Sequence, residues 1–157
     1  MQIPNVSFEQ RDIALGGSNA LNEGIAGLII PGVALGELPL STPKAIFSLK
    51  EAEALGIDDA YDTANQVNAH AEIADFYKFA GDGAELWIML VSQDTLLADI
   101  CDKANDNARK LLLNSEGRIK IWGVATARSA GYTATITEGL DQDVFDAVPK
   151  AQELCEE

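Results

Sequence analysis

Residues 84–91 read "AELWIMLV", an apolar run without a regular polar alternation. A run of this kind is typical of a strand that is covered on both faces, as in the middle of a parallel sheet. The sequence "GDG" directly before it ends a helical pattern, and a second helical pattern follows it. The run therefore predicts a central strand between two helices, and the rest of the fold is worked out from this unit.

Three further segments predict strands. "GIAGLIIPGVA" at 24–34 indicates a first buried strand, and the proline within it favours an edge position or a strand end. "IKIWGVA" at 119–125 predicts a second central strand. "AIF" at 45–47 is long enough for a short strand only.

A short helix is predicted from Ser48, because "SLKE" has the spacing of a capping box. In such a box the Ser48 hydroxyl accepts the Glu51 amide, and the Glu51 side chain returns to Ser48. Gly56 is a natural stop for this helix. The two prolines before it exclude a helix over 38–43.

Three longer stretches have apolar residues at spacings of three and four, and each predicts one helix. They cover about residues 63–80, 95–113 and 143–157, and Pro149 predicts a kink or a late start in the last one. A polar loop is predicted over 126–138. The alternation of buried strands and helices predicts an α/β fold, with a layered, mostly parallel sheet and helices packed on it.

Residues 1–20 predict an extended N-terminal arm, because "IPNVSFEQ" alternates loosely and "LGGSN" follows it. Residues 21–157 are then a single α/β domain of ordinary size. The last predicted helix is not followed by the strand that would complete a crossover. This pattern predicts that the chain is the N-terminal part of a longer protein, or that a partner supplies the missing strand. In the alternative interpretation, the last helix simply packs on one face of the sheet.

The chain has 11 basic and 25 acidic residues, a net charge of −14, and this excess of acid argues against nucleic acid and anionic membranes as partners. No apolar run approaches the roughly 18 residues of a membrane span. The N-terminus lacks the basic and apolar blocks of a secretory signal. The acidity is interpreted as a solvated surface rather than a cation site.

The sequence contains no recognisable catalytic motif. It has no Gly-Lys pair for a P-loop and no Gly-x-Ser-x-Gly elbow. "GDGAEL" has only the first two glycines of a dinucleotide fingerprint, and it precedes a strand instead of following one. Cys101 and Cys155 form no Cys-x-x-Cys motif, so both are predicted to be small buried apolar residues in a reducing compartment. We predict no catalytic, cofactor-binding or metal-binding residue.

One histidine and four groups of charged residues are of interest. His70, the only histidine, lacks the spacing of a zinc motif and is interpreted as a partly exposed residue in mid-helix. Three groups are carboxylates: Asp58, Asp59 and Asp62; Asp99, Asp102 and Asp106; Asp141, Asp143 and Asp146. The first lacks the spacing of a calcium loop, the second predicts an exposed helical face, and the third suits a helix start. The basic residues predict a modest positive patch, which serves charge balance or contacts an acidic neighbour such as another copy: Arg109, Lys110, Arg118, Lys120 and Arg128.

Four spaced segments have the arrangement of a known family: Gly24 to Gly36, Leu40 to Pro43, "IFSLKEAEALG" at 46–56 and "FYKFAGDGAELWIMLV" at 76–91. Together they resemble the contractile phage tail sheath family and its prophage relatives, over about residues 20–125. The chain has Gly-Asp-Gly-Ala where that family has Gly-Gly before the strand. It also lacks the family's Arg after the strand, so it resembles a divergent, prophage-type branch.

The resemblance implies a structural subunit and not an enzyme. Such a subunit polymerises around a tail tube, and its terminal arms add strands to the sheets of its neighbours. The implied partners are other copies of the same chain and the tail tube protein, and no cofactor is needed. The implied location is the virion tail, assembled in the bacterial cytoplasm. Subunits of that family are also longer than this chain, in line with a fragment.

Two other functions remain open from the sequence. A ligand-binding or enzymatic α/β domain would place its site at the carboxyl ends of the strands, near Ser92, Gln93, Thr126 and Arg128, although no Gly-rich phosphate turn follows either strand. An adaptor would bind one partner through its acidic face. The size in solution separates these classes, because a sheath subunit forms rings, tubes or large polymers.

Overall fold

The two longest apolar runs form neighbouring strands in the middle of a sheet. The computed structural model of the chain describes residues 25–125 and 131–156. Strand β1 (Ala26–Gly32) pairs in parallel with β3 (Leu86–Ser92) along its whole length. The strand order is β2-β3-β1-β4, in which β4 (Ile121–Val124) is parallel to β1 and β2 (Lys44–Ile46) is antiparallel to β3.

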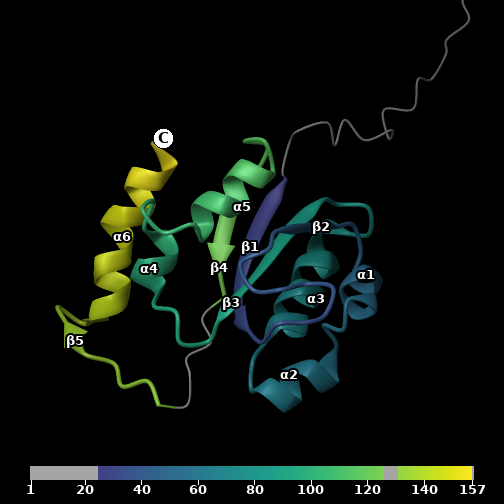
Figure 1. Cartoon of the computed structure of the whole chain (residues 1–157), viewed down its shortest axis with the longest axis horizontal. Coiled ribbons are helices and arrows are strands. Elements are labelled where there is room, and N and C mark those ends of the chain that lie inside the picture. The colour runs from purple at the N-terminus through teal and green to yellow at the C-terminus, as the bar shows by residue number, and fades with distance from the viewer. Residues whose placement is uncertain (1–24, 126–130, 157) are drawn as a thin grey trace, which may run out of the picture.

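The sheet is covered by helices on both faces, as Figure 1 shows. Helices α1 (Leu49–Ala54), α2 (Asp59–Asn65) and α3 (Ala69–Ala80) cover one face. Helices α4 (Leu97–Cys101) and α5 (Ala108–Asn114) cover the other, and α6 (Gln142–Cys155) packs on α4. The predicted α/β fold with a mostly parallel sheet is confirmed. The predicted arm, residues 1–20, lies outside the described residues.

The side chains of β3 explain why its sequence is apolar throughout. Leu86, Ile88 and Leu90 point to the first helical layer and pack among its buried residues. Met89 and Val91 point to the second layer. Because successive side chains of a strand leave on opposite faces, a strand between two helical layers needs apolar residues at every position.

Pro31 lies near the end of β1, as the sequence predicts, although β1 is a central strand. The Ala125 amide donates to the Ile29 carbonyl at 2.9 Å, so the backbone of Ile29 faces β4. Alternate residues of a parallel strand direct their backbone groups to the same side, so Pro31 also faces that side. Since β4 ends at Val124, opposite Ile29, the missing amide of Pro31 removes no ladder bond.

The capping box at α1 forms with one change of partner. The Ser48 hydroxyl accepts the Glu51 amide at 3.3 Å, as predicted. The Glu51 carboxylate accepts the amide of Phe47 at 2.9 Å, one residue before the predicted Ser48. Gly56 follows the helix with a positive φ of 96°, a conformation that glycine adopts without strain.

The prediction of one helix over 63–80 is wrong. The chain forms α2 and α3 instead, and Gln66 between them has a φ of 56°. The Asp62 carboxylate accepts the amides of His70 and Ala71, both at 3.1 Å, so it caps the start of α3. The apolar spacing continues from α2 into α3, so the spacing alone cannot predict where one helix ends and the next begins. The hydrogen bonds of the Asp62 carboxylate stabilise the break between them.

The prediction of one helix over 95–113 is also wrong, because residues 102–107 separate α4 from α5. Asp102 accepts the amide of Ala104 at 2.8 Å. The side-chain amides of Asn105 and Asn107 donate to the Asp99 carbonyl at 3.2 and 3.3 Å. These local bonds replace the helical ladder, so the second carboxylate group does not form one helical face.

Two features near the C-terminus differ from prediction. The segment 119–125 is an edge strand and not a central one, because β4 pairs with β1 alone among the described strands. A hairpin of β5 (Ile136–Thr137) and β6 (Leu140–Asp141) begins inside the predicted loop, 126–138, and ends after it. Helix α6 is confirmed, and it begins at Gln142, so Pro149 lies inside it and does not delay its start.

The two cysteines differ in environment. Cys101 is buried in α4, as predicted, whereas Cys155 is exposed, contrary to prediction. Burial, and next the nearby Asp143 carboxylate, raises the pKa of Cys101 to about 11. At pH 8 only about one Cys101 thiol in a thousand is then ionised, and the thiolate is the reactive form.

We therefore expect a thiol reagent to modify one cysteine of the folded protein at pH 8, and mass spectrometry of peptides to place the label on Cys155. Both cysteines should react at once in denaturant. Because the pKa of Cys101 is raised, its labelling should accelerate only as the pH rises toward 11. Equal labelling of both residues in the folded protein at pH 8 would contradict this assignment.

Candidate assembly interface

The outer edge of β4 is open among the described strands. Ala125 donates inward to β1, so the strand period of two directs the backbone groups of Trp122 and Val124 outward. A row of outward amide and carbonyl groups is a template on which another strand can pair. The edge is short, with four residues in β4.

An apolar groove of about 480 Å³ lies beside this edge, on the face that α3 covers only in part. Its floor is formed by Ala26, Gly27 and Leu28 of β1, and Ile121 of β4 is exposed over 71% of its surface. Phe76 and Phe79 of α3 form the opposite wall. The α3 layer thus ends before β4 and leaves apolar surface next to an unpaired strand edge.

The other face of β4 is covered. Trp122 packs against the buried residues of α4 and α6, and Val124 packs against those beneath α5. Side-chain packing therefore anchors β4 through one of its two faces only. The strand is therefore held in place by the fold while its edge and its groove face stay accessible.

The carboxyl ends of the strands were the alternative place for a site, and their polar residues have structural contacts. The side-chain amide of Gln93 donates to the Asn65 carbonyl at 2.8 Å, which satisfies the end of α2. The Ser92 hydroxyl accepts the Asp94 amide at 3.5 Å. Thr126 and Arg128 lie outside the described residues, so a site formed by all four residues stays a prediction.

Tyr61 fixes the chain directly after β1. Its hydroxyl donates to the Val33 carbonyl at 2.7 Å and accepts the Val33 amide at 2.8 Å. Gly32 leaves the space for this side chain, because a Cβ at Gly32 would lie 2.6 Å from the hydroxyl oxygen. Burial raises the pKa of Tyr61, so the hydroxyl stays protonated and remains a donor.

His70 lies in the first turn of α3 and not in mid-helix, and its side chain is only 12% exposed. Its Nδ1 lies 2.8 Å from the Asp59 carboxylate, and its Nε2 lies 3.4 Å from Glu53. It therefore connects the three helices of one layer. No group of three or more His, Cys, Asp or Glu residues in 25–125 and 131–156 is arranged to hold a metal ion.

Some members of the carboxylate groups serve as helix caps. Asp58 accepts the Tyr61 amide at 2.8 Å and starts α2. Asp143 is buried and accepts the amides of Leu97 and Ala98, 2.8 and 2.9 Å away, so it caps α4 from a distant helix. Sequence reasoning interpreted Asp143 only as a favourable acid at a helix start. A usable signal was Leu96, which precedes α4 and has no side-chain acceptor of its own.

The predicted basic patch is divided between internal pairs and exposed residues. Arg118 pairs with Glu85 at 2.9 Å and lies over the Trp87 ring. Lys110 is exposed on α5 and forms no ion pair with any residue that the structure describes. Arg109 lines a pocket between α5 and α6. Arg128 lies outside the described residues.

The fold and the open edge define the chain as an α/β domain with an exposed strand edge. Residues 3–157 match the family described as DUF2586, N-terminal domain, and the chain belongs to this family. No curated protein and no solved structure matches the chain significantly. No helix in the part that the structure describes is long and apolar enough to cross a membrane.

Proposed function

We propose that the chain is a structural subunit of a phage or prophage contractile tail sheath. Copies assemble around a tail tube, and a strand from a neighbouring copy adds to the open edge of β4. The observation that carries this proposal is the unpaired β4 edge next to an apolar groove. An incoming strand would satisfy the outward backbone groups and cover Ile121, which is 71% exposed.

The sequence offers a segment for this role. Residues 1–20 contain Val6 and Phe8, two apolar residues at the spacing that places side chains on the same face of a strand. If this face turns toward the groove, both side chains cover apolar surface there. Strand addition of this type combines backbone hydrogen bonds for affinity with side-chain pockets for specificity.

The mechanism is mechanical. A strand that belongs to one copy and pairs with the sheet of the next links the copies without a rigid interface. The bodies of the copies can then shift between an extended and a contracted packing while the links persist. Small free-energy differences per subunit add up over the whole assembly. The partners are other copies of the chain and the tail tube protein, and the location is the virion tail.

Negative-stain electron microscopy of the chain, beside a variant that lacks residues 1–20, tests the proposal. We expect rings or tubes from the chain with residues 1–20 present and dispersed particles from the shortened one. Circular dichroism serves as the control, because both samples should have the same helical content per folded domain. Dispersed small particles in both samples would contradict the proposal and favour a ligand-binding domain, to be examined by ligand screening at the strand ends.

A further inference from the structure

Phe79 is a large apolar side chain that lies mostly in solvent. It lies at the end of α3 and is 85% exposed, more than any other large apolar residue in the described part of the chain. Its contact with Lys78 places the ammonium 5.6 Å from the ring centroid but leaves the ring in solvent. A protruding aromatic side chain of this type is a common anchor in protein interfaces.

The same face of α3 carries negative charge. Glu72 and Asp75 precede Phe79 by seven and four residues, so the three side chains form one stripe along the helix. All three line the groove beside β4. Glu72 and Asp75 form no ion pair with a residue that the structure describes. The stripe therefore presents an apolar knob next to two carboxylates.

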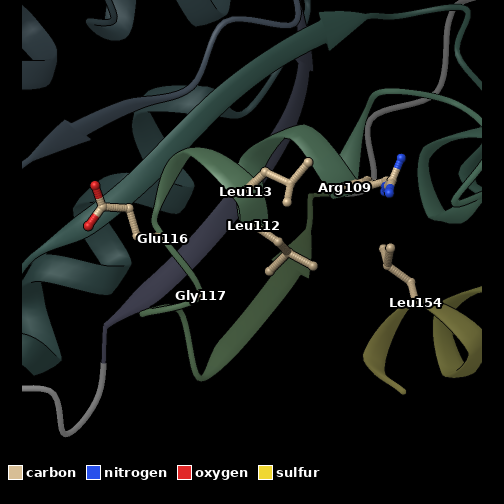
Figure 2. A pocket seen from close by; sticks show the side chains of 6 residues that line it. All are labelled: Arg109, Leu112, Leu113, Glu116, Gly117 and Leu154. Atoms are coloured by element: carbon tan, nitrogen blue, oxygen red, sulfur yellow. The ribbon is translucent and has the colours of Figure 1, made fainter. Parts of the chain in front are cut away.

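A pocket of complementary character lies on the opposite side of the sheet. It is enclosed by Leu112 and Leu113 of α5 and by Leu154 of α6, with Arg109 at one end and Glu116 at the other (Figure 2). Its volume is about 270 Å³ and its walls are mostly apolar. An apolar cavity of about 150 Å³ is enough to bind benzene, so this pocket has room for a phenylalanine ring.

The charge near this pocket is opposite to that of the stripe. Lys110 follows the pocket residue Arg109 on α5 and is exposed, so α5 presents a cationic side chain near the end of the pocket away from Glu116. The knob and the pocket occupy opposite faces of the sheet, α3 on one and α5 on the other. Phe79 and the pocket of one molecule therefore cannot contact each other, but Phe79 of one molecule can contact the pocket of another.

We propose that Phe79 of one copy enters the α5–α6 pocket of the next copy, with Glu72 and Asp75 facing Lys110. The contact is heterologous, so each copy donates one knob and receives another. Contacts of this type generate rings or helical filaments. The inference rests on the proposed self-assembly and names a second contact for it. The inserted residue, Phe79, comes from the α3 wall of the groove, and the receiving surface is the α5–α6 pocket instead of the β4 edge.

Cysteine cross-linking between two variants tests the contact. We would replace Cys155 with serine in both, and introduce Ala80→Cys in one and Glu116→Cys in the other. Ala80 is the exposed last residue of α3, next to Phe79, and Glu116 is exposed at one end of the pocket, so the Phe79 ring and the leucines of the pocket stay in place. On mild oxidation the mixture should yield a one-to-one disulfide dimer. The matched control pairs Glu116→Cys with Ala54→Cys, an exposed alanine that ends α1.

We expect the first pair to cross-link at least about tenfold faster than the control pair, because docking raises the effective concentration of the two thiols. High salt should reduce the difference, since charges contribute to the docking. Equal rates for the two pairs would overturn the proposed contact. If the rates are equal but removal of residues 1–20 still abolishes tubes, the sheath function stands without this contact. If cross-linking is fast but no rings or tubes form, the contact stands without that function.

Discussion

Replacement of Asp143 with alanine is expected to lower the free energy of unfolding by about 2–4 kcal/mol. The Asp143 carboxylate accepts the first two amides of α4, from Leu97 and Ala98, at 2.8 and 2.9 Å. Ala98 is buried, so its amide would lose a partner that water cannot readily replace. The carboxylate also lies at the positive end of the helix dipole.

Urea denaturation followed by tryptophan fluorescence measures this effect, because Trp122 packs against α4 and α6. Asp146→Ala is the matched control, since Asp146 is an exposed acid on the same helix that accepts the Gln142 side-chain amide and caps no helix in the described part of the chain. We expect the control to change stability by less than about 0.5 kcal/mol. Asp143→Asn should fall between the two, because its amide oxygen still accepts. Equal midpoints for the Asp143→Ala and Asp146→Ala variants would contradict the capping role.

The Asp143 cap explains how the C-terminal helix α6 is attached to the rest of the fold. The Asp143 cap joins residues 46 positions apart in the sequence. Two ion pairs, Lys150 with Asp102 at 2.9 Å and Lys103 with Glu153 at 3.1 Å, bridge α6 to the segment after α4. The Lys103–Glu153 pair is exposed and the Lys150–Asp102 pair is partly exposed, so both contribute little by themselves. The buried carboxylate therefore fixes the position of α6.

The parts of the fold that the sequence predicted depend on local or strongly periodic signals. The apolar runs gave β1 and β3 because a strand covered on both faces excludes polar residues. The box at Ser48 gave α1 because its partners lie three residues apart. The two long helices were predicted wrongly, because Asp62 and Asp102 form bonds that interrupt the chain without interrupting its apolar spacing.

The candidate interface was less predictable. The apolar composition of 119–125 is shared by central and edge strands, so the sequence could not place β4 at the edge. The exposure of Ile121 and Phe79 depends on where α3 ends relative to the sheet, which is a tertiary property. The cap provided by Asp143 joins distant residues and has only an indirect sign, the lack of an acceptor at Leu96.

Replacement of Val124 with proline is expected to raise the concentration needed for assembly at least tenfold, by a loss of about 1.4 kcal/mol or more per strand-addition contact. The amide of Val124 faces outward, so proline removes a donor that an added strand would use and places its ring against that strand. Pairing of β4 with β1 should persist, because that ladder uses the groups on the other side of the strand. Light scattering as a function of protein concentration measures the change.

Val124→Ala separates loss of the donor from loss of the side chain. It keeps the outward amide and removes the methyl groups that pack beneath α5. If strand addition at β4 drives assembly, the alanine variant should assemble near the wild-type concentration, whereas the proline variant should not, and both should keep the wild-type circular dichroism spectrum. Equal assembly of the folded proline variant and the wild type would show that the β4 edge receives no strand. The groove beside it would then need another occupant, because Ile121 would remain exposed on a sheet face that α3 leaves open.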